Sequence, residues 1–287
     1  MTAFLLLLAG LGASSLAAPL AVMDDLGVTV YLASVPGRVV CLSPGATEIV
    51  YALGAGKCLS AVCRQCDYPA QAKKHPQTGD IMNPSLEAVM AVRPDLVVTT
   101  GGVQKELVLN LRRMDLPVLM LYPHSVTGVL GNITALGRAL GREAEAAELV
   151  SRLRARISRL AAPPGGRRPK VYFEMWHDPL MAIGDAGYVG DLIRLAGADN
   201  VAKGLAEEYP RVSPELVIGA DPDVILLSYC DKPARAAGFV GNRPGWEGIK
   251  AVKAGRVYGD MDMDPILRPG PRLADGLEQL VKRIRPE

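Results

Sequence analysis

Aromatic side chains and an excess of charge of one sign are both scarce in this chain. Phe, Trp and Tyr make up 5% of the 287 residues, and Trp176 and Trp246 are the two tryptophans. A ligand site built as an aromatic cage would therefore have few side chains to use. The formal net charge of +2 argues against a nucleic-acid binder, because phosphate recognition needs a concentrated basic face.

A hydrophobic run long enough to span a membrane is also missing from the N-terminal segment. Phe4 to Leu8 is apolar throughout, small residues follow to Ala18, and the first charge comes at Asp24. Such a short stretch is typical of the apolar region of a secretion signal rather than of a membrane helix. We expect residues 1–17 to be a signal peptide cleaved after Ala17, which predicts a periplasmic protein. The alternative is a buried N-terminal helix.

Export would expose the cysteines to an oxidising compartment. The chain has five of them, Cys41, Cys58, Cys63, Cys66 and Cys230. Because the number is odd, at least one is free or paired outside the chain. We expect one disulfide among Cys58, Cys63 and Cys66. A structural zinc site is the alternative, but it needs four ligands and the sequence offers no second Cys-x2-Cys pair.

Strand-like and helix-like segments alternate after the leader. Hydrophobic residues make up 49% of the chain and charged residues 22%, which is ample for buried cores. Short apolar runs at 38–43, 96–100, 118–122, 224–228 and 256–259 read as strands, with helical spacing between them. This alternation predicts an α/β fold with mostly parallel sheets flanked by helices.

One long amphipathic segment divides the chain. From Arg142 to Leu160, apolar residues recur every three or four positions, and Pro163-Pro164-Gly165-Gly166 ends the pattern. We predict two lobes, at 18–141 and 163–287, joined by a single rigid helix at 142–162. The alternative is a helix inside one continuous domain.

A weak internal repeat supports two lobes. Glu87 precedes Pro94-Asp95 and a strand, and Glu215 precedes Pro222-Asp223 and a strand, with seven residues from Glu to Pro in both. The two lobes therefore appear in the sequence as copies of one helix–strand unit. Chance similarity is the alternative, since Pro-Asp before a strand is common.

The expected ligand site lies beyond the carboxyl ends of the strands, where open parallel sheets bind small molecules. Tyr and Trp there would offer flat apolar faces with a hydrogen-bonding edge. If the lobes face each other, these loops line a cleft between them. The strand ends place these candidates there: Ser43-Pro44, Cys66-Asp67-Tyr68-Pro69, Gly101-Gly102 and Tyr122 in the first lobe, and Trp176-His177-Asp178, Tyr209, Tyr229 and Asp260-Met261-Asp262 in the second.

Several stretches carry a family resemblance. They are RVVCLSP at 38–44 with Thr47-Glu48, CDYP at 66–69, Leu86-Glu87 with RPDLV at 93–97, WHDPL at 176–180, VSPE at 212–215 with DPD at 221–223, and RPGPR at 268–272. The chain resembles the cobalamin-binding branch of the periplasmic receptors that have a helical backbone between their lobes and serve ABC importers. The Ser-Pro, Glu and Pro-Asp elements are shared with haem and siderophore receptors, which are the alternative within the class.

The resemblance implies two sets of roles. Tyr68, Trp176, Tyr209, Asp260 and Arg272 fall where ligand-cleft residues lie in that family, and we add Asp67 and His177 from the strand-end argument. Glu87 and Glu215 fall where one acidic residue on each lobe meets Arg on the permease dimer, which works with its ATPase subunits. The chain departs from the family at Ile81, Thr99 and Thr100, which stand near positions that can hold Trp. The resemblance implies a monomer that captures a corrinoid as its ligand.

Other chemistry fits the sequence poorly. Asp260, Asp262 and Asp264 alternate, but Pro265 and Pro271 stand where a calcium-binding EF-hand loop needs Gly and Glu. No activated nucleophile or phosphate-binding loop accompanies these carboxylates, so we expect no enzyme, no resident metal and no catalytic residues; a metal-dependent hydrolase is the alternative. His177 has two interpretations, an axial ligand to the metal of a corrin or haem and a packed or hydrogen-bonding side chain.

Overall fold

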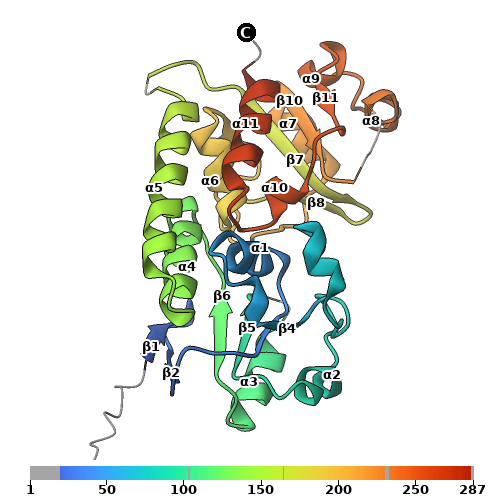
Figure 1. Cartoon of the computed structure of the whole chain (residues 1–287). Helices are drawn as coiled ribbons and strands as arrows, with labels where there is room; N and C mark the ends of the chain where they lie inside the picture. Colours follow the sequence, from blue (N-terminus) through green and yellow to red (C-terminus); the bar gives the residue numbers. More distant parts are fainter. Residues whose placement is uncertain (1–19, 103, 164, 230–232, 286–287) are drawn as a thin grey trace, which may run out of the picture.

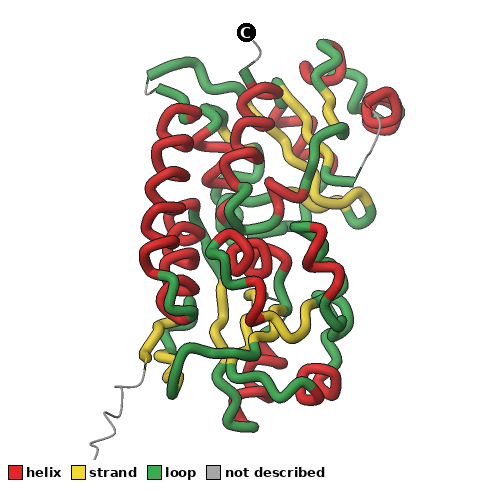
Figure 2. The backbone as a smooth tube through the Cα atoms, in the orientation of Figure 1, coloured by secondary structure: helices red, strands yellow, loops and turns green. Residues whose placement is uncertain are grey.

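The computed structural model describes residues 20–102, 104–163, 165–229 and 233–285. The expected signal peptide at 1–17 lies outside these ranges. Two sheets and their covering helices make up the fold (Figures 1 and 2). Across the described residues, no helix combines the length and the apolar character that a bilayer crossing requires.

The N-terminal sheet has four parallel strands in the order β4-β3-β5-β6. The strands are β3 (Val39–Cys41), β4 (Leu59–Val62), β5 (Leu96–Thr100) and β6 (Val118–Leu121). Its helices are α1 (Pro44–Ala52), α2 (Leu86–Ala91), α3 (Lys105–Arg113) and α4 (Val126–Ala139), with short 3-10 turns η1 (Gly56–Cys58) and η2 (Ala70–Lys74). The strands are almost wholly buried, because helices cover both faces of a parallel sheet.

The C-terminal sheet has the order β11-β10-β7-β8, and β9 also pairs with β7. All pairs are parallel except β7 with β8, which form an antiparallel hairpin. The strands are β7 (Lys170–His177), β8 (Leu180–Ala182), β9 (Asp199–Asn200), β10 (Val224–Leu227) and β11 (Val257–Tyr258). The helices are α6 (Tyr188–Leu195), α7 (Pro214–Ala220), α8 (Pro233–Gly241), α9 (Lys250–Lys253), α10 (Asp264–Leu267) and α11 (Leu273–Ile284).

The long helix α5 (Glu143–Leu160) lies within the segment 142–162 for which a helix was predicted. All strands of the N-terminal sheet precede α5, and all strands of the C-terminal sheet follow it. It packs against α4 of the N-terminal half and against α11 of the C-terminal half. Figure 1 shows it running along one side of the molecule past both sheets. Leu149, Leu153 and Ile157 bury its apolar stripe in a core shared by both halves.

The internal repeat of the sequence is also a structural repeat. Ser85 caps α2 and Ser213 caps α7, and a residue of left-handed backbone conformation follows each helix, Arg93 at φ 47° and Asp221 at φ 48°. The Pro-Asp pair that follows has the same role in both copies. Asp95 accepts a hydrogen bond from the backbone N–H of Arg38, 2.9 Å away at the start of β3, and Asp223 accepts one of 2.8 Å from Lys170 at the start of β7.

An antiparallel hairpin of β1 (Leu20–Met23) and β2 (Thr29–Leu32) precedes the N-terminal sheet and was not predicted. Asp24 holds its turn by accepting hydrogen bonds of 2.9 Å from the N–H groups of Leu26 and Val28. Because this carboxylate is buried, its ion pair with Arg112 ties the hairpin to α3.

Candidate functional site

A cavity of about 660 Å³ lies between the two halves of the molecule. The N-terminal half contributes Ser43, Pro44, Gly45, Ile81, Met82, Thr100, Gly101, Gly102, Tyr122 and Pro123. The C-terminal half contributes Met175, Tyr188, Glu207, Glu208, Tyr209, Leu267, Arg268 and Pro269. The volume is in the range typical of small-molecule sites, and most of the lining is apolar.

The fold explains why the cavity lies here. Gly101 and Tyr122 directly follow β5 and β6, and Ser43 lies two residues after β3, so the carboxyl ends of three parallel strands open onto the cavity. The backbone also approaches closely at two glycines. A Cβ on Gly45 would lie 2.5 Å from the carbonyl oxygen of Pro269, and one on Gly101 would overlap the ring of Tyr122.

Arg268 joins the two halves beside the cavity. Its guanidinium lies 2.7 Å from a carboxylate oxygen of Asp67, in the N-terminal half, and 2.9 Å from one of Asp264, one turn earlier on its own side. The nearby Arg272 forms a bidentate pair with Glu48 of α1, at 2.9 and 2.6 Å. The Glu48 side chain is 2% exposed, so these two arginines neutralise a buried charge at the contact between the halves.

The predicted ligand residues divide among several places. Tyr209 lines the cavity. Asp67 is outside the cavity lining but forms an ion pair with Arg268, which lines it. Tyr68 and Arg272 line a separate hollow of about 290 Å³, where the guanidinium of Arg272 lies 4.0 Å from the centre of the Tyr68 ring. Asp260 does not line the cavity and pairs with Arg283 of α11 at 2.5 Å.

Trp176 and His177 belong to an aromatic cluster outside the cavity lining. Their rings lie 5.7 and 5.0 Å from that of Tyr229, and His177 also meets Phe239 at 5.2 Å. Beneath the cluster, Glu174 is fully buried and accepts hydrogen bonds from Tyr229 and from Arg243, the latter bidentate at 2.7 Å. Trp176 is 47% exposed, so this cluster presents an apolar face to solvent.

The two predicted docking residues occupy equivalent positions. Glu87 and Glu215 are both exposed and are the second residue of α2 and of α7, each after a capping Ser. Hydrogen bonds from its own backbone N–H and from Ser213 lower the pKa of Glu215. The helix N-terminus favours a negative charge at both sites.

Glu48, Glu207, Glu208 and Arg268 are charged residues at or near the cavity that the sequence argument did not select as ligand-binding residues. Glu208 directly precedes the predicted Tyr209, and Arg268 opens the RPGPR stretch, so both stood beside positions that were chosen. Glu48 was part of a stretch that carries the family resemblance, but its role was not predicted, because that role depends on a partner 224 residues away in the chain.

The distance between two sulfur atoms favours Cys63–Cys66 as the predicted disulfide. The sulfur atoms of Cys63 and Cys66 lie 2.6 Å apart, just before Asp67, whereas Cys58 lies in η1. The hydrogen bond from Cys66 lowers the pKa of Cys63, so Cys63 is the better nucleophile for attack on a disulfide. Cys230 lies outside the described residues.

We expect oxidised glutathione to close the Cys63–Cys66 pair. Intact-mass measurement should then show the loss of two hydrogen atoms, reversed by a dithiol reductant, in wild type and in Cys58→Ser. Cys66→Ser should show no such loss. The same loss of two hydrogen atoms in Cys66→Ser would reveal a different disulfide and contradict the pairing, and a bound zinc ion released by acid would favour the metal alternative.

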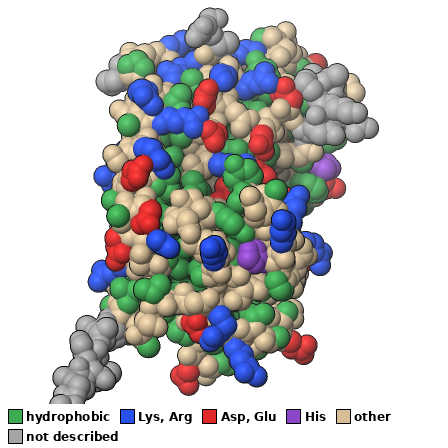
Figure 3. Space-filling model, viewed as in Figure 1, with side chains coloured by type: hydrophobic (Ala, Val, Ile, Leu, Met, Phe, Trp, Pro, Cys, Tyr) green, Lys and Arg blue, Asp and Glu red, His purple; other side chains and the backbone are tan. Residues whose placement is uncertain are grey.

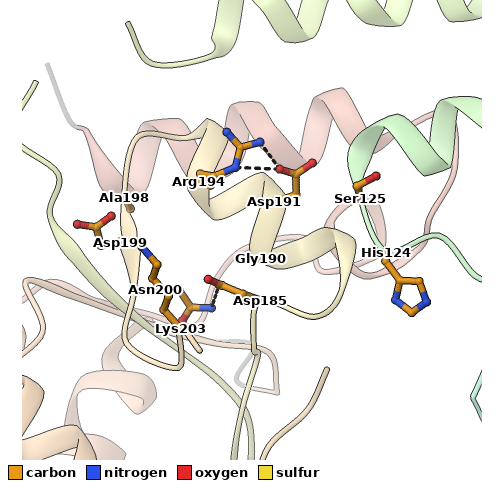
Figure 4. Close-up of a pocket in the computed structure, with 10 residues that line it drawn as sticks. All are labelled: His124, Ser125, Asp185, Gly190, Asp191, Arg194, Ala198, Asp199, Asn200 and Lys203. Atoms are coloured by element: carbon orange, nitrogen blue, oxygen red, sulfur yellow. Dashed lines mark hydrogen bonds and ion pairs between the residues drawn. The ribbon is translucent and has the colours of Figure 1, made fainter. Parts of the chain in front are cut away.

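Another hollow, of about 200 Å³, lies between α6 and the start of α4, away from the cavity and from the hollow of Tyr68 and Arg272 (Figure 4). Its polar side chains bond mainly to one another: Asp191 pairs with Arg194, and Asp185 accepts a hydrogen bond of 2.8 Å from Asn200. Within the described ranges, no three His, Cys, Asp or Glu side chains are arranged to hold a metal ion. Figure 3 shows basic and acidic side chains interspersed on one face of the molecule.

Comparison with known proteins places the chain in a family. A family model described as periplasmic binding protein matches residues 39–262, well over half of the chain. An uncharacterized ABC transporter substrate-binding lipoprotein of Bacillus subtilis, YvrC, is 29% identical over 278 residues, which covers 94% of this chain and 86% of that protein. The vitamin B12-binding protein of Pectobacterium carotovorum is 27% identical over 257 residues, covering 88% and 89%.

A solved structure agrees with these sequence relatives. The periplasmic heme-binding protein RhuT of Roseiflexus, in its apo form, superposes with a TM-score of 0.75 at 28% identity, covering 86% of this chain and 97% of that one. The matched family consists of substrate-binding proteins and not of enzymes, which removes the hydrolase alternative. With its two helix-flanked sheets and the cavity between them, the chain belongs to the periplasmic binding protein family.

Proposed function

We propose that this chain captures a corrinoid, cobalamin or a relative, in the cavity between its halves and delivers it to an ABC importer. The cavity carries the proposal, because it is large, mostly apolar and formed by loops from both sheets. The similarity to a vitamin B12-binding protein supports the ligand, and the similarity to an ABC transporter substrate-binding lipoprotein supports delivery to an importer. The chain would act without chemistry, as a monomer in the periplasm after removal of residues 1–17.

The halves act as lobes in this mechanism. We infer lobes at 18–141 and 163–287 joined at 142–162, where α5 packs against helices on both sides. A helix is stiffer than a strand linker, so the lobes would move by a modest hinge around the ligand. The loaded receptor would then dock on the permease dimer through Glu87 and Glu215, one acidic residue from each lobe.

The ligand-binding residues follow from this geometry. Tyr209 would pack on the ligand from the cavity wall. Asp67, Tyr68 and Arg272 would stabilise the edge of the cavity on the side of the N-terminal lobe and the contact between the lobes. Trp176, His177 and Asp260 lie outside the cavity lining, so any contact with the ligand would depend on a part of it that extends beyond the cavity.

Haem is the second candidate ligand. The similarity to a heme-binding protein and the phenols of Tyr122 and Tyr209 on the cavity wall favour it. A phenolate oxygen can ligate haem iron. A siderophore is the remaining alternative within the class.

Calorimetric titration of the purified mature chain with cobalamin, cobinamide and haem separates these candidates. We expect at least one corrinoid to bind at about micromolar strength or tighter, and more tightly than haem. Tight binding of haem together with no heat from either corrinoid would replace the corrinoid assignment by the haem assignment.

A further inference from the structure

The wall of the cavity carries more acidic than basic side chains. Arg268 is the basic residue of the lining, and three carboxylates surround it: Asp67 at 2.7 Å, Asp264 at 2.9 Å and Glu48 at 3.6 Å. Glu207 and Glu208 also line the cavity and form no ion pair with the described residues. The wall therefore has an excess of negative charge on the side that carries Tyr209.

Glu208 lies within reach of both halves. The phenol of Tyr122, which follows β6 in the N-terminal half, donates a hydrogen bond of 3.2 Å to a carboxylate oxygen of Glu208. Burial and the neighbouring Glu208 charge raise the pKa of Tyr122 and that of Tyr209. Both phenols therefore stay protonated at neutral pH and can donate a hydrogen bond to a neighbouring acceptor.

A carboxylate in this position accepts hydrogen bonds and donates none. Charge-assisted bonds from ligand N–H groups are favourable, whereas a ligand carboxylate placed against the exposed Glu207 and the half-buried Glu208 meets like charge and is repelled. Arg268 cannot offset a ligand carboxylate well, because its donors already face protein carboxylates. The wall thus discriminates between ligands by the charge and the donors at their periphery.

We propose that Glu207 and Glu208 select ligands that carry amide or cationic groups at their periphery and reject ligands that carry carboxylates. This inference rests on the proposed function, since it concerns the same cavity. It favours corrinoids, whose ring bears primary amides, over haem, whose ring bears two propionates.

Two corrins that differ at these groups test the proposal. Cobinamide carries the amides, and cobyrinic acid carries carboxylates on the same ring. By calorimetry, wild type should bind cobinamide more tightly by at least about tenfold. The double variant Glu207→Gln with Glu208→Gln should lose most of that ratio, and Glu247→Gln, an exposed residue outside the cavity lining, should keep it. An unchanged ratio in the double variant would overturn the proposal.

Failure of the corrinoid assignment gives a different result. Wild type would then bind neither corrin, and the comparison moves to haem and its dimethyl ester, which lacks the propionate charges. Preference for the ester in wild type, lost in the double variant, would support charge selection without corrinoid transport. Equal binding of haem and ester by both proteins would overturn charge selection, and binding of none of the four ligands would contradict both proposals.

Discussion

Reversal of both docking charges, Glu87→Lys with Glu215→Lys, is expected to abolish transport while ligand affinity stays near that of wild type. The two carboxylates lie at matching positions of α2 and α7 and are exposed, so neither supports the cavity wall. A permease dimer presenting one Arg cluster per subunit would attract this pair, and lysines would repel it. Such like-charge contacts cost several kcal/mol, so uptake should fall at least about 100-fold.

The measurement is uptake of the bound corrinoid by cells that express the chain with its importer, beside calorimetry on the purified variants. Glu106→Lys with Glu247→Lys makes a matched control, because both residues are exposed and the net change in charge is the same. The control should transport normally. Normal uptake by the double docking variant would show that the docking surface lies elsewhere.

Truncation of Arg272 to Ala should be among the most destabilising single changes in the chain. Arg272 holds Glu48 through two hydrogen bonds, and the Glu48 side chain is 2% exposed. Removal of the guanidinium leaves a buried carboxylate with only the more distant Arg268, 3.6 Å away, and also removes the contact with the Tyr68 ring. We expect the free energy of unfolding to fall by about 3 kcal/mol, the usual cost of an uncompensated buried charge.

Urea denaturation measures this loss directly. Arg152→Ala is the control, since its pair with Glu148 is 65% and 70% exposed, and its loss should change the free energy of unfolding by less than about 0.5 kcal/mol. Equal stability of the two variants would contradict the assignment of Arg272 as a structural tie between the halves.

Much of the fold was predictable because its signals are local. The strand Leu96–Thr100 agrees with the expected range, and α5 lies within the predicted segment 142–162, since apolar runs and helical spacing depend on near neighbours. The equal spacing from Glu87 and from Glu215 to Pro-Asp also had a local cause. Both copies have a left-handed residue after the helix and place an Asp at the start of a neighbouring strand.

The cavity lining was less predictable, because it depends on where each strand end turns. β7 continues into a hairpin with β8, and neighbouring strand residues point to opposite faces. Met175 therefore lines the cavity, while Trp176 points to the opposite side and joins the aromatic cluster. His177 is the last residue of β7, where the hairpin turn begins, and it joins the same cluster. Asp260 follows β11, the edge strand of its sheet, and lies outside the lining.

The most direct test of a ligand held between the halves is the affinity of Tyr209→Ala for cobinamide, measured by calorimetry beside Tyr31→Ala. Tyr209 is one of the predicted ligand residues that line the cavity, whereas Tyr31 is 66% exposed on β2. Loss of an aromatic face from the ligand should weaken binding by at least about tenfold in Tyr209→Ala, with no change in Tyr31→Ala. Wild-type affinity in a folded Tyr209→Ala protein would contradict binding in this cavity.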